Sequence, residues 1–194
     1  APDRTLWFGT SEGLMRWHPD VPDELERISL TPRSDPESSA PVVTRILPAP
    51  DGALYLGTYR GLIVFSPEDG VRATHDLASG LPVEEIVDMA ADRRGRLWLG
   101  TPDGLVLFDP ESGRHHLYTK EDGLPADEII LRTMVTRANG EIAFATTAGL
   151  GAFDPLAFPA PHDAPDVALT GVWVNNRRLP SLAPGSGDGE TSPP

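Results

Sequence analysis

The stretch Leu97-Trp-Leu-Gly-Thr-Pro-Asp-Gly-Leu-Val-Leu-Phe-Asp-Pro110 decides the fold of this chain. Its two short apolar runs, which begin at Leu97 and Leu105, each contain a large aromatic residue and predict buried β-strands. Residues 101–104 between them predict a tight turn, because Gly104 can adopt a positive φ without steric cost. The stretch therefore predicts a strand, a turn and a second strand.

The same pattern occurs four times and aligns without a gap. The other copies are Leu6-Trp-Phe-Gly-Thr-Ser-Glu-Gly-Leu-Met-Arg-Trp-His-Pro19, Leu54-Tyr-Leu-Gly-Thr-Tyr-Arg-Gly-Leu-Ile-Val-Phe-Ser-Pro67 and Ile142-Ala-Phe-Ala-Thr-Thr-Ala-Gly-Leu-Gly-Ala-Phe-Asp-Pro155. The second glycines of the four copies stand at positions 13, 61, 104 and 149, so the copies are 48, 43 and 45 residues apart. A period near 45 residues, with a further strand before and after the repeated pair, is typical of a four-stranded propeller blade.

We therefore predict an all-β chain with about three and a half four-stranded β-propeller blades in residues 1–155. The first copy has no inner strand before Leu6, and the fourth has Ala143 and Ala145 where the aromatic residue and the glycine are expected. Because so few blades cannot close a ring, we expect the C-terminal part of a larger propeller. After it we predict a Pro-rich linker (156–166), the opening strands of a β-sandwich domain (167–183) and a disordered tail (184–194).

The composition argues against several classes of partner and site. Sixteen basic residues against 29 acidic ones give a net charge of −13, which argues against nucleic acid and against an anionic membrane surface. The absence of Cys excludes disulfides and Cys-ligated metals. No apolar run approaches the roughly 20 residues that cross a bilayer, and the start at Ala1 has no signal-peptide features. We expect a soluble part cut from a larger protein.

The sequence carries no motif for catalysis, metal binding or a cofactor. It has neither a Gly-x-Ser-x-Gly elbow nor a nucleotide-binding loop. The adjacent His115 and His116 would point to opposite faces of a solvated strand and so could not easily bind one metal. We therefore expect no enzyme activity in this part, no metal and no cofactor. The repeated aromatic position of Trp7, Tyr55 and Trp98 is expected in the core, with sugar stacking as the alternative.

One rim of the propeller is the predicted recognition surface. The second and fourth connections of each blade emerge on the same rim, and these are the Thr-x-x-Gly turns and the Gly-Leu-Pro turns at 80–82 and 123–125. Varied residues on a constant frame suit ligand binding, although adjacent acids also simply solvate turns. The candidate ligand-binding residues are Glu12, Tyr59, Arg60, Glu84, Glu85, Asp103, Asp127 and Glu128. Tyr59 and Arg60 would supply an aromatic platform and a forked donor.

The repeat Leu-Trp-x-Gly-Thr-x-x-Gly-Leu with a following Phe-Asp-Pro, together with Tyr118 and Asp122-Gly-Leu-Pro125, resembles the two-component regulator propeller repeat over roughly residues 5–155. Residues 167–180 resemble the opening strands of the triple-tyrosine β-sandwich that follows such propellers. The resemblance implies the periplasmic sensor region of an inner-membrane histidine kinase, hybrid kinase or diguanylate cyclase. It also implies the rest of the same receptor as a partner, and a small molecule or glycan as ligand.

Two other functions remain open. The first is a propeller lyase similar to streptogramin lyases, which would want a His and an acid near a metal on one rim; His75, close to the Gly-Leu-Pro turn at 80–82, is the nearest candidate. The second is a structural spacer or dimerisation module. We also expect self-association, because open ends would expose apolar residues such as Leu6, Phe8 and Phe144. Two copies of three and a half blades would then give a ring of seven.

Overall fold

The structure is a computed structural model that describes residues 4–30, 40–158, 172–174 and 177–179. Two compact units divide the chain, residues 1–162 and residues 163–194. The only helices in the described ranges are two short 3-10 turns, η1 (Lys120–Asp122) and η2 (Pro155–Ala157). Neither these nor any other described segment forms a helix that could span a membrane.

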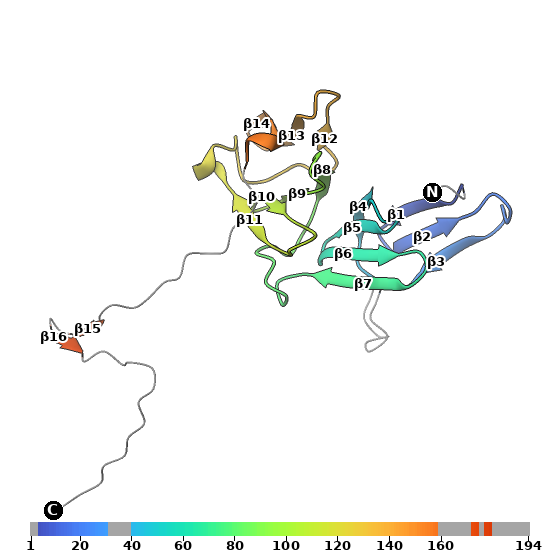
Figure 1. The fold of residues 1–194 in the computed structure, drawn as a ribbon, viewed down its shortest axis with the longest axis horizontal. Coiled ribbons are helices and arrows are strands. Elements are labelled where there is room, and N and C mark those ends of the chain that lie inside the picture. Colours follow the sequence, from blue (N-terminus) through green and yellow to red (C-terminus); the bar gives the residue numbers. More distant parts are fainter. Residues whose placement is uncertain (1–3, 31–39, 159–171, 175–176, 180–194) are drawn as a thin grey trace, which may run out of the picture. The chain divides into compact units, whose positions relative to one another are not determined.

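The first unit contains four antiparallel sheets that follow one another along the chain (Figure 1). The first sheet consists of β1 (Leu6–Thr10), β2 (Gly13–Trp17) and β3 (Leu25–Ile28). The second consists of β4 (Val43–Pro48), β5 (Leu54–Thr58), β6 (Gly61–Ser66) and β7 (Gly70–His75). The third consists of β8 (Asp88–Ala91), β9 (Leu97–Thr101), β10 (Gly104–Phe108) and β11 (His115–Tyr118). The fourth consists of β12 (Val135–Thr136), β13 (Ile142–Thr146) and β14 (Gly149–Phe153).

The predicted all-β propeller fold is confirmed. The strands of each sheet are paired in sequence order, and the four repeat copies form the hairpins β1–β2, β5–β6, β9–β10 and β13–β14. Within the described residues the first sheet lacks a counterpart of the inner strands β4 and β8. The fourth sheet likewise lacks a counterpart of the outer strands β7 and β11. The two central sheets are therefore complete blades, and each terminal sheet has three strands.

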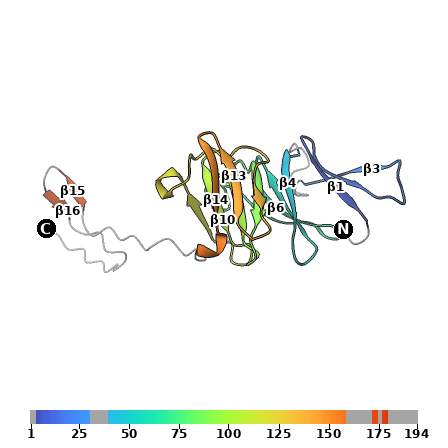
Figure 2. The ribbon, with the colours of Figure 1, turned by 90° about the horizontal axis from the view of Figure 1, so that it is seen from above.

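The core lies between consecutive sheets, because the strands alternate apolar side chains between their two faces. Leu97 and Leu99 face the second sheet and pack with Leu62 and other residues of one cluster. Trp98 faces the opposite way and packs against residues of the fourth sheet. A third cluster joins the first and second sheets, where β1 lies beside β4 (Figure 2).

The repeated aromatic position is buried to different degrees. Trp98 is 1% exposed, as expected of a core residue, whereas Trp7 and Tyr55 are half-buried. The expectation that Phe144 lies on an exposed end face is wrong, because Phe144 is 3% exposed and packs with Trp98. Leu6 and Phe8, by contrast, are exposed as expected.

The last residues of the first unit pack on its blades. Residues 156–158, which the sequence assigned to the linker, follow β14 after Asp154 and Pro155, and Phe158 belongs to the aromatic cluster around Trp98. The rest of the predicted linker lies outside the described residues, as do the predicted tail and residues 31–39.

The second unit contains one described hairpin. Its strands β15 (Val172–Val174) and β16 (Arg177–Leu179) pair antiparallel. They fall where the sequence predicted a strand and the start of its partner.

Candidate functional site

The Thr-x-x-Gly turns of the predicted rim share one hydrogen-bond arrangement. In the second sheet, the Thr58 hydroxyl donates to the carbonyl of Gly61 at 2.8 Å and accepts from the backbone N–H of Arg60 at 3.0 Å. The same donation recurs in the other three copies, at 2.9, 2.8 and 3.0 Å. The threonine thus fixes the backbone of each turn, so the two variable residues are presented in a constant geometry.

The Gly-Leu-Pro connections run beside these turns. The backbone N–H of Ile86 donates to the carbonyl of Thr58 at 2.9 Å, and that of Ile129 donates to the carbonyl of Thr101 at 3.0 Å. The predicted site residues therefore fall into separate groups, and the members of each group lie on adjacent turns. One group is Tyr59 and Arg60 with Glu84 and Glu85, a second is Asp103 with Asp127 and Glu128, and Glu12 lies apart on the turn between β1 and β2.

Most of these side chains point into solvent. Tyr59 is 37% exposed, and Arg60, Glu84, Glu85, Asp103 and Glu128 are exposed as well. Asp127 is half-buried, and its carboxylate accepts a hydrogen bond from the backbone N–H of Lys120 at 2.6 Å. Glu12 forms an ion pair with Arg27 at 3.9 Å. The rim is thus rich in carboxylate acceptors beside one aromatic ring and one guanidinium, which suits a polar ligand that donates hydrogen bonds.

The four histidines among the described residues belong to no metal site. Within the described ranges, no group of three or more His, Asp or Glu side chains is arranged to hold a metal ion. His75 packs its ring against Phe108, with centroids 4.8 Å apart, and burial lowers the pKa of its imidazole. On β11, His116 is exposed while His115 is half-buried rather than fully solvated.

A pocket between the third and fourth sheets was not predicted. It has a volume of about 330 Å³, and five aromatic side chains are among the residues that line it. Those aromatic residues are Trp98, Tyr118, Phe144, Phe153 and Phe158. Leu124 and Pro125 of the second Gly-Leu-Pro turn also line it. Burial raises the pKa of the Tyr118 hydroxyl, in keeping with an apolar site. Trp98, Phe144 and Phe153 stand in the aligned copies of the repeat. The repeat could therefore have predicted part of the lining of this pocket.

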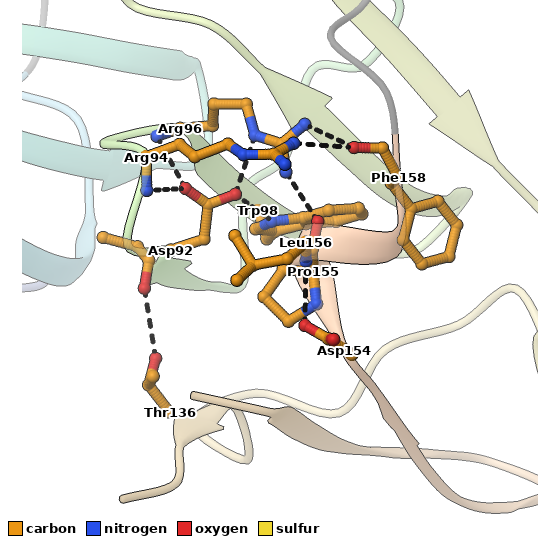
Figure 3. A network of polar contacts seen from close by, with 10 residues as sticks. Asp92, Arg94, Arg96, Trp98, Thr136, Asp154, Pro155, Leu156 and Phe158 are labelled. Atoms are coloured by element: carbon orange, nitrogen blue, oxygen red, sulfur yellow. Dashed lines mark hydrogen bonds and ion pairs between the residues drawn. The ribbon is translucent and has the colours of Figure 1, made fainter. Parts of the chain in front are cut away.

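A buried polar network lies next to this pocket (Figure 3). The Nε of Arg96 donates to the Asp92 carboxylate at 2.7 Å, and the indole N–H of Trp98 donates to the same carboxylate at 3.3 Å. The other guanidinium nitrogens of Arg96 donate to the carbonyls of Pro155 at 2.6 Å and Phe158 at 2.9 Å. Arg96 and Asp92 are 5% and 8% exposed. This network holds the end of the first unit against its third sheet.

A family model supports the resemblance seen in the repeat. Residues 80–103 match the two component regulator propeller family. The match covers one Gly-Leu-Pro turn and the first three residues of the following Thr-x-x-Gly turn, including Glu84, Glu85 and Asp103. It does not reach residues 167–180, so the triple-tyrosine β-sandwich stays a prediction. A comparison with curated proteins gave no match.

Solved structures support the fold. The extracellular domain of the putative hybrid two component system BT3049 from B. thetaiotaomicron aligns with a TM-score of 0.66 and 22% identity, over 91% of this chain and 25% of that one. The corresponding domain of BT4673 from the same organism gives 0.64 and 21%, over 78% and 20%. A catalytically inactive virginiamycin B lyase from Staphylococcus aureus, solved with quinupristin, gives 0.56 and 15%, over 82% and 54%. The chain thus spans a quarter or less of the two-component domains.

Proposed function

We propose that this chain, which carries a two component regulator propeller repeat, is an extracytoplasmic ligand-sensing region of a bacterial signal-transduction receptor. In this proposal a small molecule or a glycan binds on the rim of the Thr-x-x-Gly and Gly-Leu-Pro turns. The rest of the same receptor is its partner, and the region lies in the periplasm as part of an inner-membrane protein. It performs no catalysis of its own.

The observation that carries the proposal is the family match at residues 80–103. The solved two-component domains that share the fold are described as extracellular, which agrees with a sensor outside the cytoplasm. The rim adds a physical argument, because each turn holds its variable residues on a hydrogen-bonded frame, and in the second and third sheets that frame lies next to the acids of the following connection. Surface loops on a rigid scaffold are where binding residues are concentrated.

The lyase alternative has weaker support. The virginiamycin B lyase shares the fold at 15% identity, and His75, the candidate for its chemistry, packs on Phe108. A shared fold does not by itself indicate shared chemistry.

The rim can be tested in the intact receptor. We expect Tyr59→Ala and Arg60→Ala to abolish signalling in a reporter assay while the circular dichroism spectrum of the region is unchanged. Glu68→Ala is the matched control, because Glu68 is exposed on the turn between β6 and β7, at the opposite rim of the same sheet. Full signalling by both rim variants would remove these residues from the site.

A further inference from the structure

A cavity of about 820 Å³ lies between the second and third sheets, on the rim opposite the Thr-x-x-Gly turns. The β4–β5 turn, the β8–β9 turn and the turn between β10 and β11 line it. Both sheets are complete four-stranded blades, so the cavity belongs to the inside of the sheet series. The second sheet contributes Tyr55 and Val64, which lie opposite each other on β5 and β6.

The aromatic position of the repeat carries a guanidinium group in the first and third sheets. The guanidinium of Arg16 lies over the Trp7 ring, 5.9 Å from its centroid, and that of Arg96 lies over the Trp98 ring at 6.0 Å. Arg16 lies opposite Trp7 on the paired strand, whereas Arg96 stands two residues before Trp98. The two sheets thus reach the same cation–π contact from different positions.

Each of these guanidinium groups is also bound to a carboxylate. The Nε of Arg16 donates to the Glu26 carboxylate at 2.9 Å, and the Nε of Arg96 donates to the Asp92 carboxylate at 2.7 Å. The chain therefore builds one arrangement twice. It consists of an aromatic ring, a guanidinium on the face of that ring, and a carboxylate that holds the guanidinium.

The second sheet has the aromatic ring but supplies no guanidinium to it. Val64 occupies the repeat position of Arg16, and Ala53 occupies that of Arg96. Among the described residues, no Arg or Lys side chain lies over the Tyr55 ring. Because Val and Ala are both much smaller than Arg, the space beside this ring is left to the cavity.

Carboxylates, by contrast, are present at the cavity. Asp51, Asp109 and Glu111 line it. Burial raises the pKa of the Tyr55 hydroxyl, and the negative charges of Asp51 and Glu111 raise it further. The electrostatic potential at this ring is therefore negative, which favours a bound cation.

Three further arginines line the cavity, and their guanidinium groups are bound by other parts of the chain. Arg72 forms ion pairs with Asp51 at 2.6 Å and with Asp69 at 3.1 Å, so two acids face one cation. Arg93 donates to a carbonyl in the β12–β13 turn at 3.2 Å. Arg94 donates at 3.3 Å to a carbonyl at the end of the first unit (Figure 3). The last two groups are thus turned toward the fourth sheet.

We propose that this cavity binds a small organic molecule that carries a guanidinium group. The group stacks on the Tyr55 ring, as Arg16 and Arg96 do on the rings of their own sheets, and donates to the Glu111 carboxylate. A planar guanidinium suits both contacts, since it stacks on aromatic faces and matches the geometry of a carboxylate. The site lies on the rim opposite the one described under the proposed function and does not depend on it.

Isothermal titration calorimetry of the full chain tests this inference, with butylguanidinium as the probe. We expect saturable binding in the millimolar range, and none of butylurea, which has nearly the same shape but no charge. Tyr55→Leu should weaken the binding of butylguanidinium about tenfold, because it removes the aromatic face. Tyr55→Phe should preserve binding, because the face remains. Val64→Arg should abolish binding, because it places a guanidinium on the ring as Arg16 does in the first sheet.

A matched pair of acids provides the control. Glu111→Gln should weaken binding severalfold, whereas Glu68→Gln should bind as the unmodified chain does, because Glu68 is exposed on the same rim outside the cavity. Three results would overturn the inference: no saturable binding to the unmodified chain, equal binding of butylurea, or unchanged affinity in Tyr55→Leu. Should Tyr55→Leu or Val64→Arg fail to fold, the exposed position 111 decides, because unchanged affinity in Glu111→Gln would also exclude the site.

Discussion

Arg96 joins parts of the chain that are far apart in the sequence. Its guanidinium contacts the Asp92 carboxylate within its own hairpin and the carbonyls of Pro155 and Phe158 at the end of the first unit. A buried ion pair contributes little net stability compared with an apolar pair, but removing one partner leaves an uncompensated charge. The value of Arg96 is therefore that it holds residues 155–158 in one position.

We expect Arg96→Ala to lower the free energy of unfolding by about 3–5 kcal/mol, because it leaves the Asp92 carboxylate buried and unpaired. The control is Arg137→Ala, which removes an exposed ion pair with Glu141 at the corresponding place of the next hairpin. That pair should contribute about 0–1 kcal/mol. Urea unfolding of both variants measures the difference, and equal losses would contradict a special role for the buried pair.

The sequence could not predict this network. Asp92 and Arg96 are four residues apart, but the carbonyls that Arg96 binds lie 59 and 62 residues further on. Every residue has a backbone carbonyl, so the sequence does not indicate which carbonyls accept the hydrogen bonds of Arg96. Only the folded structure shows them. The rim was easier to predict, because the connectivity of a blade alone places Glu84 and Glu85 beside the turn that carries Tyr59 and Arg60.

At the scale of the elements, the turn glycines show how closely the strands are packed. Gly104 has a φ of 145°, and a Cβ there would lie 2.3 Å from the carbonyl oxygen of Tyr118 on the outer strand. The contact is with backbone, so neither partner can move without disturbing the sheet. The glycine is required both by its dihedral angle and by the close approach of β11.

We expect Gly104→Ala to destabilise the chain more than Gly113→Ala does. Gly113 also has a positive φ, of 71°, but a Cβ there would meet nothing within 4 Å. The Gly113 variant should therefore cost about 1 kcal/mol for the strained dihedral angle alone, and the Gly104 variant distinctly more. Thermal melts of the two proteins compare them, and equal melting temperatures would mean that β11 does not press on the turn.

The strands themselves were predicted well because each is a short apolar run bounded by turn residues. The two runs in the deciding stretch became β9 and β10, with the turn between them. The orientation of Phe144 was mispredicted for a different reason. Phe144 stands two residues after Ile142 and shares its face, but the pattern of one strand does not say which face meets the preceding sheet.

At the scale of the whole molecule, the boundary between the two units sets which truncations are tolerated. The first unit ends at His162, and its last described residues, 155–158, contact Arg96 and the aromatic cluster around Trp98. We expect a chain that ends at His162 to unfold at the same temperature as the full chain.

A chain that ends at Asp154 should unfold at a lower temperature, because it loses Phe158 and both carbonyl acceptors of Arg96. Differential scanning calorimetry of the two truncated chains and the full chain measures this. If the shorter chain were as stable as the longer one, residues 155–158 would not belong to the folded unit.

The spacing of the Gly-Leu-Pro turns also bears on how such a protein can gain or lose blades by recombination. The two Gly-Leu-Pro turns are 43 residues apart, and the segment between them contains all four strands of the third sheet. Duplicating or deleting that segment adds or removes a whole blade and leaves every strand paired. A crossover between two Thr-x-x-Gly turns cuts a blade between its second and third strands. The resulting blade takes two strands from one copy of the repeat and two from another, so strands that evolved in different blades must pair with each other. The Gly-Leu-Pro turns are thus the places where a crossover keeps every blade whole and confines the new packing to one contact between neighbouring blades.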